Sequence, residues 1–437
     1  MIKILGEKYK FCDGVTRRSF LKIGGLTMGG LALPQILEAE DKQGIKGSHK
    51  AVINIFLPGG PPHQDMWDMK PNAPKEIRGE LKEIPTNISG TRICELFPRM
   101  ARMMDKFTVI RSMVGAYGGH DAWQCQTGRD SKSNQPPGGW PSMGAALSKL
   151  YGSAKEGVPP FVGLAPNTGH KPWGDPGMPG FLGPAHSPFL PNKDGNAKED
   201  MRLNGLTIDR LGNRKSLLNS FDTLRRDVDN KRMMEGLDAF NQQALAMLTS
   251  SRLANALNLD KEDPKLRDRY GRNQIGQSAL LARRLVEAGV TYVTVISNGW
   301  DHHGGVAGGM RQKLPSLDQA VGSLVQDLED RGLYERTIVI VMGEFGRTPK
   351  VNSRGGRDHW SFCSNILMTG AGVKHGYVHG HSDKIGAYPA DHPVGPEAFI
   401  ATVYAAMGLD TSMSIHDPGG RPFPIARHGE VVSDILA

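Results

Sequence analysis

The sequence predicts an α/β domain built on a mainly parallel sheet. Two units, 274–296 and 316–342, each run from a helical pattern through a glycine into an apolar strand. Glycine is favoured just after a helix, where the backbone turns left-handed. Strands that are almost continuously apolar are typical of parallel sheets covered by helices on both faces.

Each expected element follows from its own local pattern. Apolar runs that stop at Gly, Pro or Asn predict strands, and apolar residues three and four positions apart predict helices. In chain order we expect strands at 51–57 and 107–111, helices within 216–259 and at 274–288, a strand at 290–296, a helix at 316–331, strands at 337–342 and 365–369, and a helix at 396–407. The stretch 131–200 is so rich in Pro, Gly, Asn and Trp that we expect ordered loops there.

Composition excludes several classes of protein. The 55 Gly and 29 Pro among 437 residues are too many for a coiled coil or a helical solenoid. The net charge is +8, but Lys and Arg are interspersed with acidic residues, so no nucleic-acid partner is expected. The four Cys include no CxxC pair, which argues against a cysteine zinc site and a disulfide scaffold.

Residues 1–39 have the layout of a twin-arginine export signal. Arg17 and Arg18 precede a weakly apolar run over 23–33. This run of about 11 residues is shorter than the roughly 20 that a spanning helix needs, so no stable transmembrane helix is expected. An ordinary buried helix that begins with an Arg pair is the alternative. The leader predicts the twin-arginine export machinery as a partner and a periplasmic or extracellular protein. The mature domain would span 40–437, with a helical insertion at about 205–270.

Polar side chains gather directly after the predicted strands. Ligands in open α/β sheets bind beyond the carboxyl ends of the strands, so we expect these loops to form the functional face. The candidates are His63, Asp65, His120, Asp121, Arg129, Asp301, His302, His303, Glu344, Arg347, Asp358 and His359. His combined with Asp or Glu suits zinc, manganese or iron.

Roles can be assigned to these candidates by their chemistry. The expected metal ligands are Asp65, Asp301, His302, His303, Glu344, Asp358 and His359. The expected catalytic residues are His120, Asp121 and Arg347, and the expected substrate-binding residues are Arg129, Arg347 and His63. A guanidinium can bind phosphate or sulfate through two hydrogen bonds. The alternatives are a capping or surface role for His63, and salt bridges to nearby carboxylates for the two arginines.

Several motifs resemble a known family. The leader, Leu-Pro-Gly-Gly-Pro-Pro-His-Gln-Asp at 57–65, Gly-Glu-Phe-Gly-Arg-Thr-Pro at 343–349 and Gly-Arg-Asp-His-Trp at 356–360 resemble the exported bacterial domain-of-unknown-function family 1501. That family is thought to be a distant relative of the alkaline phosphatase and sulfatase superfamily. The resemblance implies a three-layer sandwich, alkaline-phosphatase-like, with a mainly parallel central sheet between helices and metal ions at the strand ends.

The resemblance also carries over to single positions. Asp301 with His302 or His303 looks like the Asp and His metal-binding segment of the superfamily, and His359 looks like its late metal-binding His. Glu344 stands where the superfamily has Asp-His or Asp-Asn. Two positions depart from the pattern: Gly59-Gly60 replace the Asp after the first strand, and Gly119-His120 replace the Ser, Thr or Cys nucleophile.

These departures leave two functions open. One is an exported metal-dependent hydrolase of phosphate or sulfate esters that lacks the usual covalent nucleophile, with zinc, manganese or calcium as the divalent metal. Its substrate would be an anionic small molecule or a glycan ester. The alternative is a non-catalytic exported protein that binds anionic or sulfated glycan through loop tryptophans, or that scaffolds a partner complex.

Overall fold

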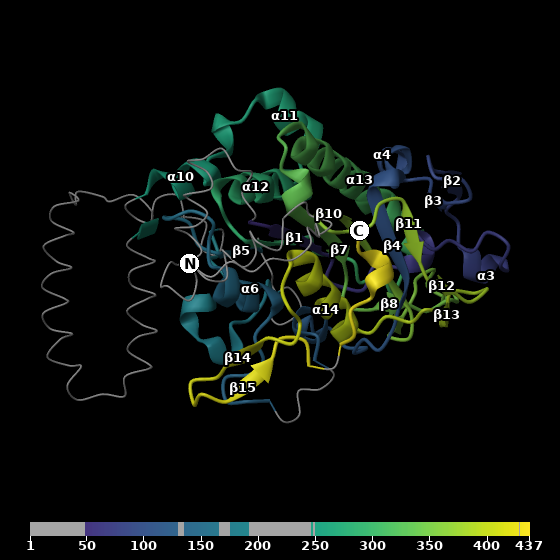
Figure 1. Ribbon diagram of the computed structural model, residues 1–437. Coiled ribbons are helices and arrows are strands. Elements are labelled where there is room, and N and C mark those ends of the chain that lie inside the picture. Colours follow the sequence, from purple (N-terminus) through teal and green to yellow (C-terminus); the bar gives the residue numbers. More distant parts are fainter. Residues whose placement is uncertain (1–48, 130–134, 166–174, 192–245, 248–249, 428) are drawn as a thin grey trace, which may run out of the picture. The chain divides into compact units, whose positions relative to one another are not determined.

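A seven-stranded sheet lies at the centre of residues 50–437, with the strand order β11-β4-β10-β7-β1-β6-β5 (Figure 1). The computed structural model describes residues 49–129, 135–165, 175–191, 246–247, 250–427 and 429–437. The expected leader at 1–39 lies outside these residues. So does the stretch 205–245 of the expected helical insertion.

The sheet is mixed and mainly parallel, as predicted. β1 runs parallel to β6 and β7, β5 is parallel to β6, and β11 is parallel to β4. Only β10 is antiparallel to its two neighbours, β4 and β7. The strands are β1 (Ala51–Phe56), β4 (Phe107–Met113), β5 (Phe161–Leu164), β6 (Tyr292–Ile296), β7 (Thr337–Met342), β10 (Ser364–Gly370) and β11 (Tyr377–His379).

Helices cover both faces of this sheet, which gives the expected three layers (Figure 1). Side chains alternate across β1: Ile53 and Ile55 pack into one hydrophobic cluster, and Val52 and Phe56 pack into the other. The first face is covered by α4 (Pro98–Arg102), α10 (Ser251–Leu257), α11 (Pro264–Tyr270), α12 (Gln274–Ala288) and α13 (Val306–Asp330). The second face is covered by α5 (Trp123–Thr127), α6 (Met143–Tyr151) and α14 (Pro396–Met407).

Most expected elements are present, and two expectations are corrected. α13 begins at Val306, ten residues before the predicted start at 316, and it contains Pro315. Met310 and Leu314 are fully buried, so core packing holds this first part of the helix despite the proline. The stretch 131–200 is not made of loops alone, because it contributes α6 and the edge strand β5. Both are buried in the core, which outweighs the loop-like composition of their surroundings.

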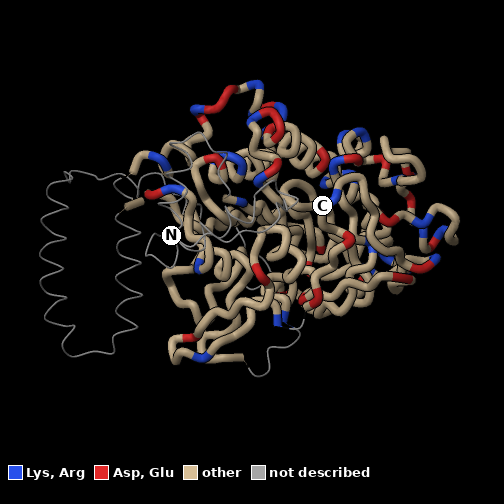
Figure 2. Tube along the Cα trace, in the orientation of Figure 1, with Lys and Arg blue, Asp and Glu red and all other residues tan. Residues whose placement is uncertain are grey.

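Shorter elements complete the described chain. They are α3 (Lys75–Arg78), β2 (Glu83–Pro85), β3 (Arg92–Cys94), β8 (Gly346–Arg347), β9 (His359–Trp360), β12 (His381–Ser382), β13 (Pro389–Asp391), β14 (Ser414–His416) and β15 (Pro422–Pro424). Basic and acidic residues are interspersed along these elements (Figure 2). Within the described ranges, no helix combines the length and the apolar character needed to cross a bilayer.

Candidate metal centre

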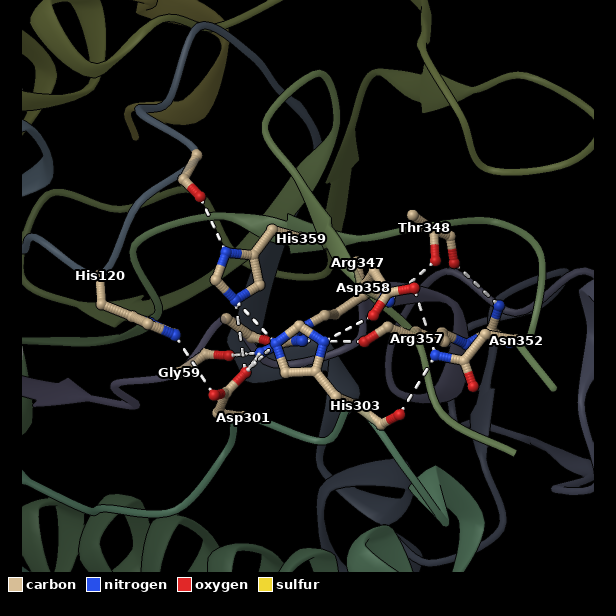
Figure 3. Close-up of polar contacts among 12 residues, drawn as sticks. Gly59, His120, Asp301, His303, Arg347, Thr348, Asn352, Arg357, Asp358 and His359 are labelled. Carbon is tan, nitrogen blue, oxygen red and sulfur yellow. Dashed lines mark hydrogen bonds and ion pairs between the residues drawn. The ribbon is translucent and has the colours of Figure 1, made fainter. Parts of the chain in front are cut away.

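Four side chains from separate loops meet beyond the carboxyl ends of the central parallel strands. Asp301 and His303 follow β6, His120 lies between β4 and α5, and His359 begins β9. Each offers one ligand atom, and the four atoms lie within 4.8 Å of one another (Figure 3). Sequences far apart along the chain thus converge on one point, as the sheet topology leads us to expect.

Asp301 stands at the centre of this group. Its Oδ1 lies 2.9 Å from His303 Nε2 and 3.4 Å from His359 Nε2, and its Oδ2 lies 3.2 Å from His120 Nε2. The exposed fractions of the four side chains are between 22% and 34%, so the group is open to solvent on one side. A small ligand can therefore reach it without a rearrangement of the fold.

The partners of two histidines fix where their protons lie. His303 Nδ1 lies 2.6 Å from Asp358 Oδ1, and His359 Nδ1 lies 2.8 Å from the carbonyl oxygen of Gly118. A carboxylate and a carbonyl can only accept, so both Nδ1 atoms carry a proton and donate it. In the neutral rings, both Nε2 atoms are then bare lone pairs. These two atoms face each other at 3.1 Å (Figure 3).

Two bare imidazole nitrogens beside a carboxylate oxygen repel one another unless a cation lies between them. Zinc binds imidazole nitrogen at about 2.0–2.1 Å in a tetrahedral arrangement, which puts neighbouring ligand atoms roughly 3.3 Å apart. The distances of 2.9, 3.1 and 3.4 Å among Asp301 Oδ1, His303 Nε2 and His359 Nε2 match this spacing, and His120 Nε2 lies 3.2 Å from the other carboxylate oxygen, Oδ2. The residues present therefore fit a divalent metal ion, with Asp358 and the Gly118 carbonyl holding the two rings.

Glu344 lies beside the group and holds its surroundings. Its Oε1 accepts a hydrogen bond from the Gly59 N–H at 2.7 Å and lies 3.4 Å from His120 Nδ1. Its Oε2 is buried and has no hydrogen-bond partner within the described part of the chain. Gly59 has a φ of +118°, and a Cβ there would lie 2.4 Å from the backbone nitrogen of Asp301. Only glycine lets these two loops approach so closely.

Arg347 is buried and holds the backbone around Asp301. It donates to the carbonyl oxygens of Gly59, Gly60 and Arg357, and it forms an ion pair with Asp301 Oδ1 at 2.5 Å. Burial alone would raise the pKa of Asp301, but the hydrogen bond and charge of Arg347 outweigh burial and hold that pKa below its usual range. Asp301 is therefore kept as a carboxylate, the form that binds metal.

Two predicted site residues have partners elsewhere. Asp65 forms a fully buried ion pair with Arg357 at 2.7 Å, and it is not among the four grouped residues. His63 is buried, with Nε2 2.8 Å from the Gly386 carbonyl oxygen, and burial lowers its pKa to about 4. The roles of metal ligand for Asp65 and substrate-binding residue for His63 stay predictions. Their contacts favour a structural role.

The remaining candidates also have other partners. His302 packs its ring against the start of α13, where a Cβ on Gly309 would lie 2.1 Å from it, so His303 is the member of the pair that faces Asp301. Asp121 Oδ1 accepts a hydrogen bond from the Trp123 N–H at 3.0 Å. Arg129 donates to the carbonyl oxygen of Pro424 and stacks over Trp140. Their predicted roles stay predictions.

Sequence reasoning did not identify two groups that hold the site. One is the carbonyl of Gly118, which has no side-chain signature. The other is Asn352, whose Nδ2 donates to Asp358 Oδ2 at 3.2 Å and to the His303 carbonyl oxygen at 3.1 Å. His120 was expected as a catalytic residue, and the structure brings it into the ligand group. Asn352 lies six residues before Asp358, a spacing that gave no sign of contact.

Comparison with known proteins places these observations in a family. Similar solved structures include the PsFucS1 sulfatase from Pseudoalteromonas sp. (13% identity, 93% of this chain and 75% of that chain covered, TM-score 0.39). Another is the phosphonate monoester hydrolase SpPMH from Silicibacter pomeroyi (10% identity, 89% of this chain and 76% of that chain covered, TM-score 0.35). A third is the lipoteichoic acid synthase LtaP from Listeria monocytogenes (10% identity, 87% of this chain and 76% of that chain covered, TM-score 0.35). No curated protein matches the sequence. Residues 49–436 match the family described as "Protein of unknown function (DUF1501)", and the chain belongs to that family.

Proposed function

We propose that the protein is an exported, metal-dependent hydrolase of phosphate or sulfate esters that forms no covalent enzyme intermediate. The observation that carries this proposal is the pair of bare imidazole nitrogens of His303 and His359, 3.1 Å apart beside Asp301. Three imidazoles and one carboxylate suit zinc or manganese. They suit calcium less well, because calcium prefers oxygen ligands alone.

The openness of the site favours catalysis over a purely structural metal. The group offers four protein ligands, the number that closes a structural zinc site, so catalysis requires a fifth position on the metal or the displacement of one ligand by water or substrate. His303 and His359 are 34% and 25% exposed, so substrate can approach from their side. When bound, a divalent metal would supply a Lewis acid that polarises an ester oxygen and activates water.

The absence of the usual nucleophile supports attack by water. The residue at the expected nucleophile position is His120, whose Nε2 is directed at Asp301. The nearby Cys125 does not replace it: its thiol is buried, donates to the Ala122 carbonyl oxygen, and has its pKa raised well above the ordinary value by burial and by the charge of Glu344. Direct hydrolysis needs only a water molecule beside the ester.

The metal analysis of purified protein tests this proposal. We expect about one equivalent of zinc or manganese per chain and turnover of at least one phosphate or sulfate ester. His359→Ala should lose both. His381→Ala is the matched control, because His381 is an exposed histidine paired with Asp391 outside the group. Failure of the wild-type protein to bind either metal after its addition would refute the proposal.

One observation favours the second function, non-catalytic binding of a glycan. Trp360, Phe362 and Tyr388 form an aromatic group beside His359, with ring centroids 5.0 to 5.6 Å apart. Phe362 and Tyr388 are 49% and 50% exposed, and exposed aromatic faces can stack on sugar rings. Binding of a sulfated polysaccharide that survives His359→Ala, with no turnover of any ester, would favour this function.

The proposal of export rests on the leader sequence. Arg17 and Arg18 precede a short apolar run of the kind that twin-arginine export recognises. Replacement of both residues by lysine should retain the protein in the cytoplasm, whereas replacement of Lys8 and Lys10 should not. Unchanged export of the Arg17→Lys, Arg18→Lys double variant would contradict this part of the proposal.

A further inference from the structure

The loop 352–356 packs directly on the backbone that follows β6. A Cβ on Gly356 would lie 2.1 Å from the carbonyl carbon of the ligand His303, so only a residue without a side chain permits this approach. On the other side of the contact, the Gly305 N–H donates to the Arg354 carbonyl oxygen at 3.1 Å. Backbone contacts therefore fix the loop, and Arg354 with it, beside the metal-ligand group.

Arg354 combines a fixed backbone with an exposed side chain. Its N–H donates to Asn352 Oδ1 at 2.9 Å, and the Nδ2 of the same asparagine donates to Asp358 and to the His303 carbonyl oxygen (Figure 3). The Arg354 side chain, in contrast, is 69% exposed. Its one ion pair within the described chain is long, with 3.9 Å between Nη2 and Asp358 Oδ1. An exposed pair of this kind contributes little free energy, so the guanidinium can leave Asp358 easily.

The guanidinium lies close to a metal ligand. Its partner atom, Asp358 Oδ1, is 2.6 Å from Nδ1 of His303. The side chain also begins over Gly304, because a Cβ on Gly304 would lie 3.8 Å from the Cβ of Arg354. Gly304 directly follows His303 and puts no side chain between the ligand and the arginine. A charge on this flexible side chain can therefore reach an anion at the metal-ligand group.

A substrate anion at this group needs a cation that solvent can reach. The two arginines that the sequence suggested for this role are buried: Arg347 is 1% exposed and donates to Asp301, and Arg129 is 5% exposed and stacks over Trp140. An approaching anion also meets the carboxylates of Asp301 and Asp358. An exposed guanidinium beside these carboxylates offsets their repulsion and attracts the anion.

We propose that Arg354 binds the phosphate or sulfate group of the substrate. Its guanidinium leaves Asp358 and donates two hydrogen bonds to anion oxygens that face away from the metal-ligand group. This inference rests on the proposed ester hydrolase and names a residue that binds its anion. The planar guanidinium matches two oxygens of a phosphate or a sulfate, and hydrogen bonds between two charged groups are the stronger kind.

Binding of inorganic phosphate and sulfate tests the proposal. Calorimetry on zinc-loaded protein, without free zinc, gives the dissociation constants. Arg354→Gln should weaken the binding of both anions about tenfold, and Arg354→Lys, which keeps the charge but loses the paired donors, should weaken it about threefold. Arg102→Gln is the matched control. Arg102 is an exposed arginine at the end of α4, ahead of the start of β4 and so at the opposite end of the sheet, and its replacement should change neither constant.

The affinity for zinc separates contact with the anion from an effect through Asp358. Competition with a chelator should give the same zinc affinity for Arg354→Gln and the wild type, because an exposed pair 3.9 Å long does little to place Asp358. A parallel loss of zinc and phosphate affinity would make Arg354 a positioning residue and overturn the proposal. Equal phosphate binding by Arg354→Gln and the wild type would also overturn it, as would failure of the zinc-loaded wild type to bind either anion.

Turnover of para-nitrophenyl phosphate and para-nitrophenyl sulfate distinguishes this inference from the proposed function. If Arg354→Gln weakens phosphate binding but the wild type hydrolyses no ester, Arg354 is an anion-binding residue and the hydrolase proposal fails. If the wild type hydrolyses an ester and Arg354→Gln leaves its KM unchanged, the hydrolase stands and Arg354 does not bind its anion.

Discussion

Replacement of Asp358 by alanine tests whether this residue positions a metal ligand or is one itself. The hydrogen bond from His303 Nδ1 to Asp358 Oδ1, 2.6 Å long, lowers the pKa of Asp358 and keeps the carboxylate ionised. In return, the carboxylate fixes the proton of His303 on Nδ1 and leaves Nε2 free for metal. Without the Asp358 carboxylate, a fraction of the protein molecules carries the proton of His303 on Nε2, where it blocks metal coordination.

The expected loss of zinc affinity follows from this geometry. Removal of a partner that orients a ligating histidine typically weakens metal binding by about 10- to 100-fold. The side chain of Asp358 is 48% exposed, so water can replace it in part as the acceptor. We therefore expect Asp358→Ala to bind zinc about tenfold more weakly, near the low end of that range. Asp358→Asn keeps an acceptor oxygen and should lose less.

Competition of the protein with a chelator for zinc measures these affinities. His303→Ala removes the ligand itself and should cost at least about ten times more affinity than Asp358→Ala. Cobalt-substituted protein provides a second readout: its absorption spectrum should be preserved in Asp358→Ala and altered in Asp301→Ala. An equal loss in Asp358→Ala and His303→Ala would identify Asp358 as a ligand. An unchanged affinity would refute the argument from the proton position.

Three further predictions concern stability and the approach of the loops. Arg347→Met leaves Asp301 and three carbonyl oxygens without their donor. It should lower the free energy of unfolding, measured in urea, by about 3–5 kcal/mol. The control Arg354→Met removes an exposed arginine and should lower the same free energy by less than about 1 kcal/mol. Burial lowers the pKa of His63 to about 4, so between about pH 6.5 and pH 4 the unfolded chain binds a proton at this residue and the folded chain does not. The contribution of His63 to the free energy of unfolding should therefore fall by about 3 kcal/mol as the pH drops from 7 to 4. His63→Gln should make the measured fall smaller. Gly59→Ala places a Cβ 2.4 Å from the backbone nitrogen of Asp301, at a positive φ. It should lower the free energy of unfolding by about 1–3 kcal/mol and weaken zinc binding. A variant with wild-type stability and wild-type zinc affinity would contradict the close approach of the two loops.

The central sheet could be predicted because its strands and helices have strong local patterns. The run 338–342 is apolar at every position, and the structure forms β7 over Thr337–Met342. Similarly, α12 ends where Gly289 stands at a φ of +109°. The start of α13 could not be predicted, because Gly308, Gly309 and Pro315 are poor helix formers. That part of the helix is held by contacts with the core, which the local sequence does not contain.

The sequence predicted the place of the candidate metal centre, beyond the ends of the strands, better than it predicted which side chains belong to it. Residues after parallel strands meet at one edge of the sheet, so the seven expected ligands were expected to lie close together. Asp301, His303 and His359 belong to the group of four; the other expected ligands, Asp65, His302, Glu344 and Asp358, do not. Asp65 has the same chemistry and a similar position after a strand. Asp65 lies outside the ligand group because it is buried and forms an ion pair with Arg357 instead. A fully buried carboxylate needs a cationic partner nearby. A pairing over 292 positions of the chain has no local signal.

The neighbouring residues His302 and His303 illustrate how backbone geometry selects a ligand. Both follow β6 and both are imidazoles, so the sequence offers no choice between them. The His302 N–H donates to the Trp300 carbonyl oxygen, and a Cβ on Gly309 would lie 2.1 Å from the ring of His302. Because Gly309 has no side chain, the ring of His302 can pack against α13, while His303 is left to face Asp301. The choice of His303 over His302 as a member of the group therefore depends partly on Gly309, a residue outside the group.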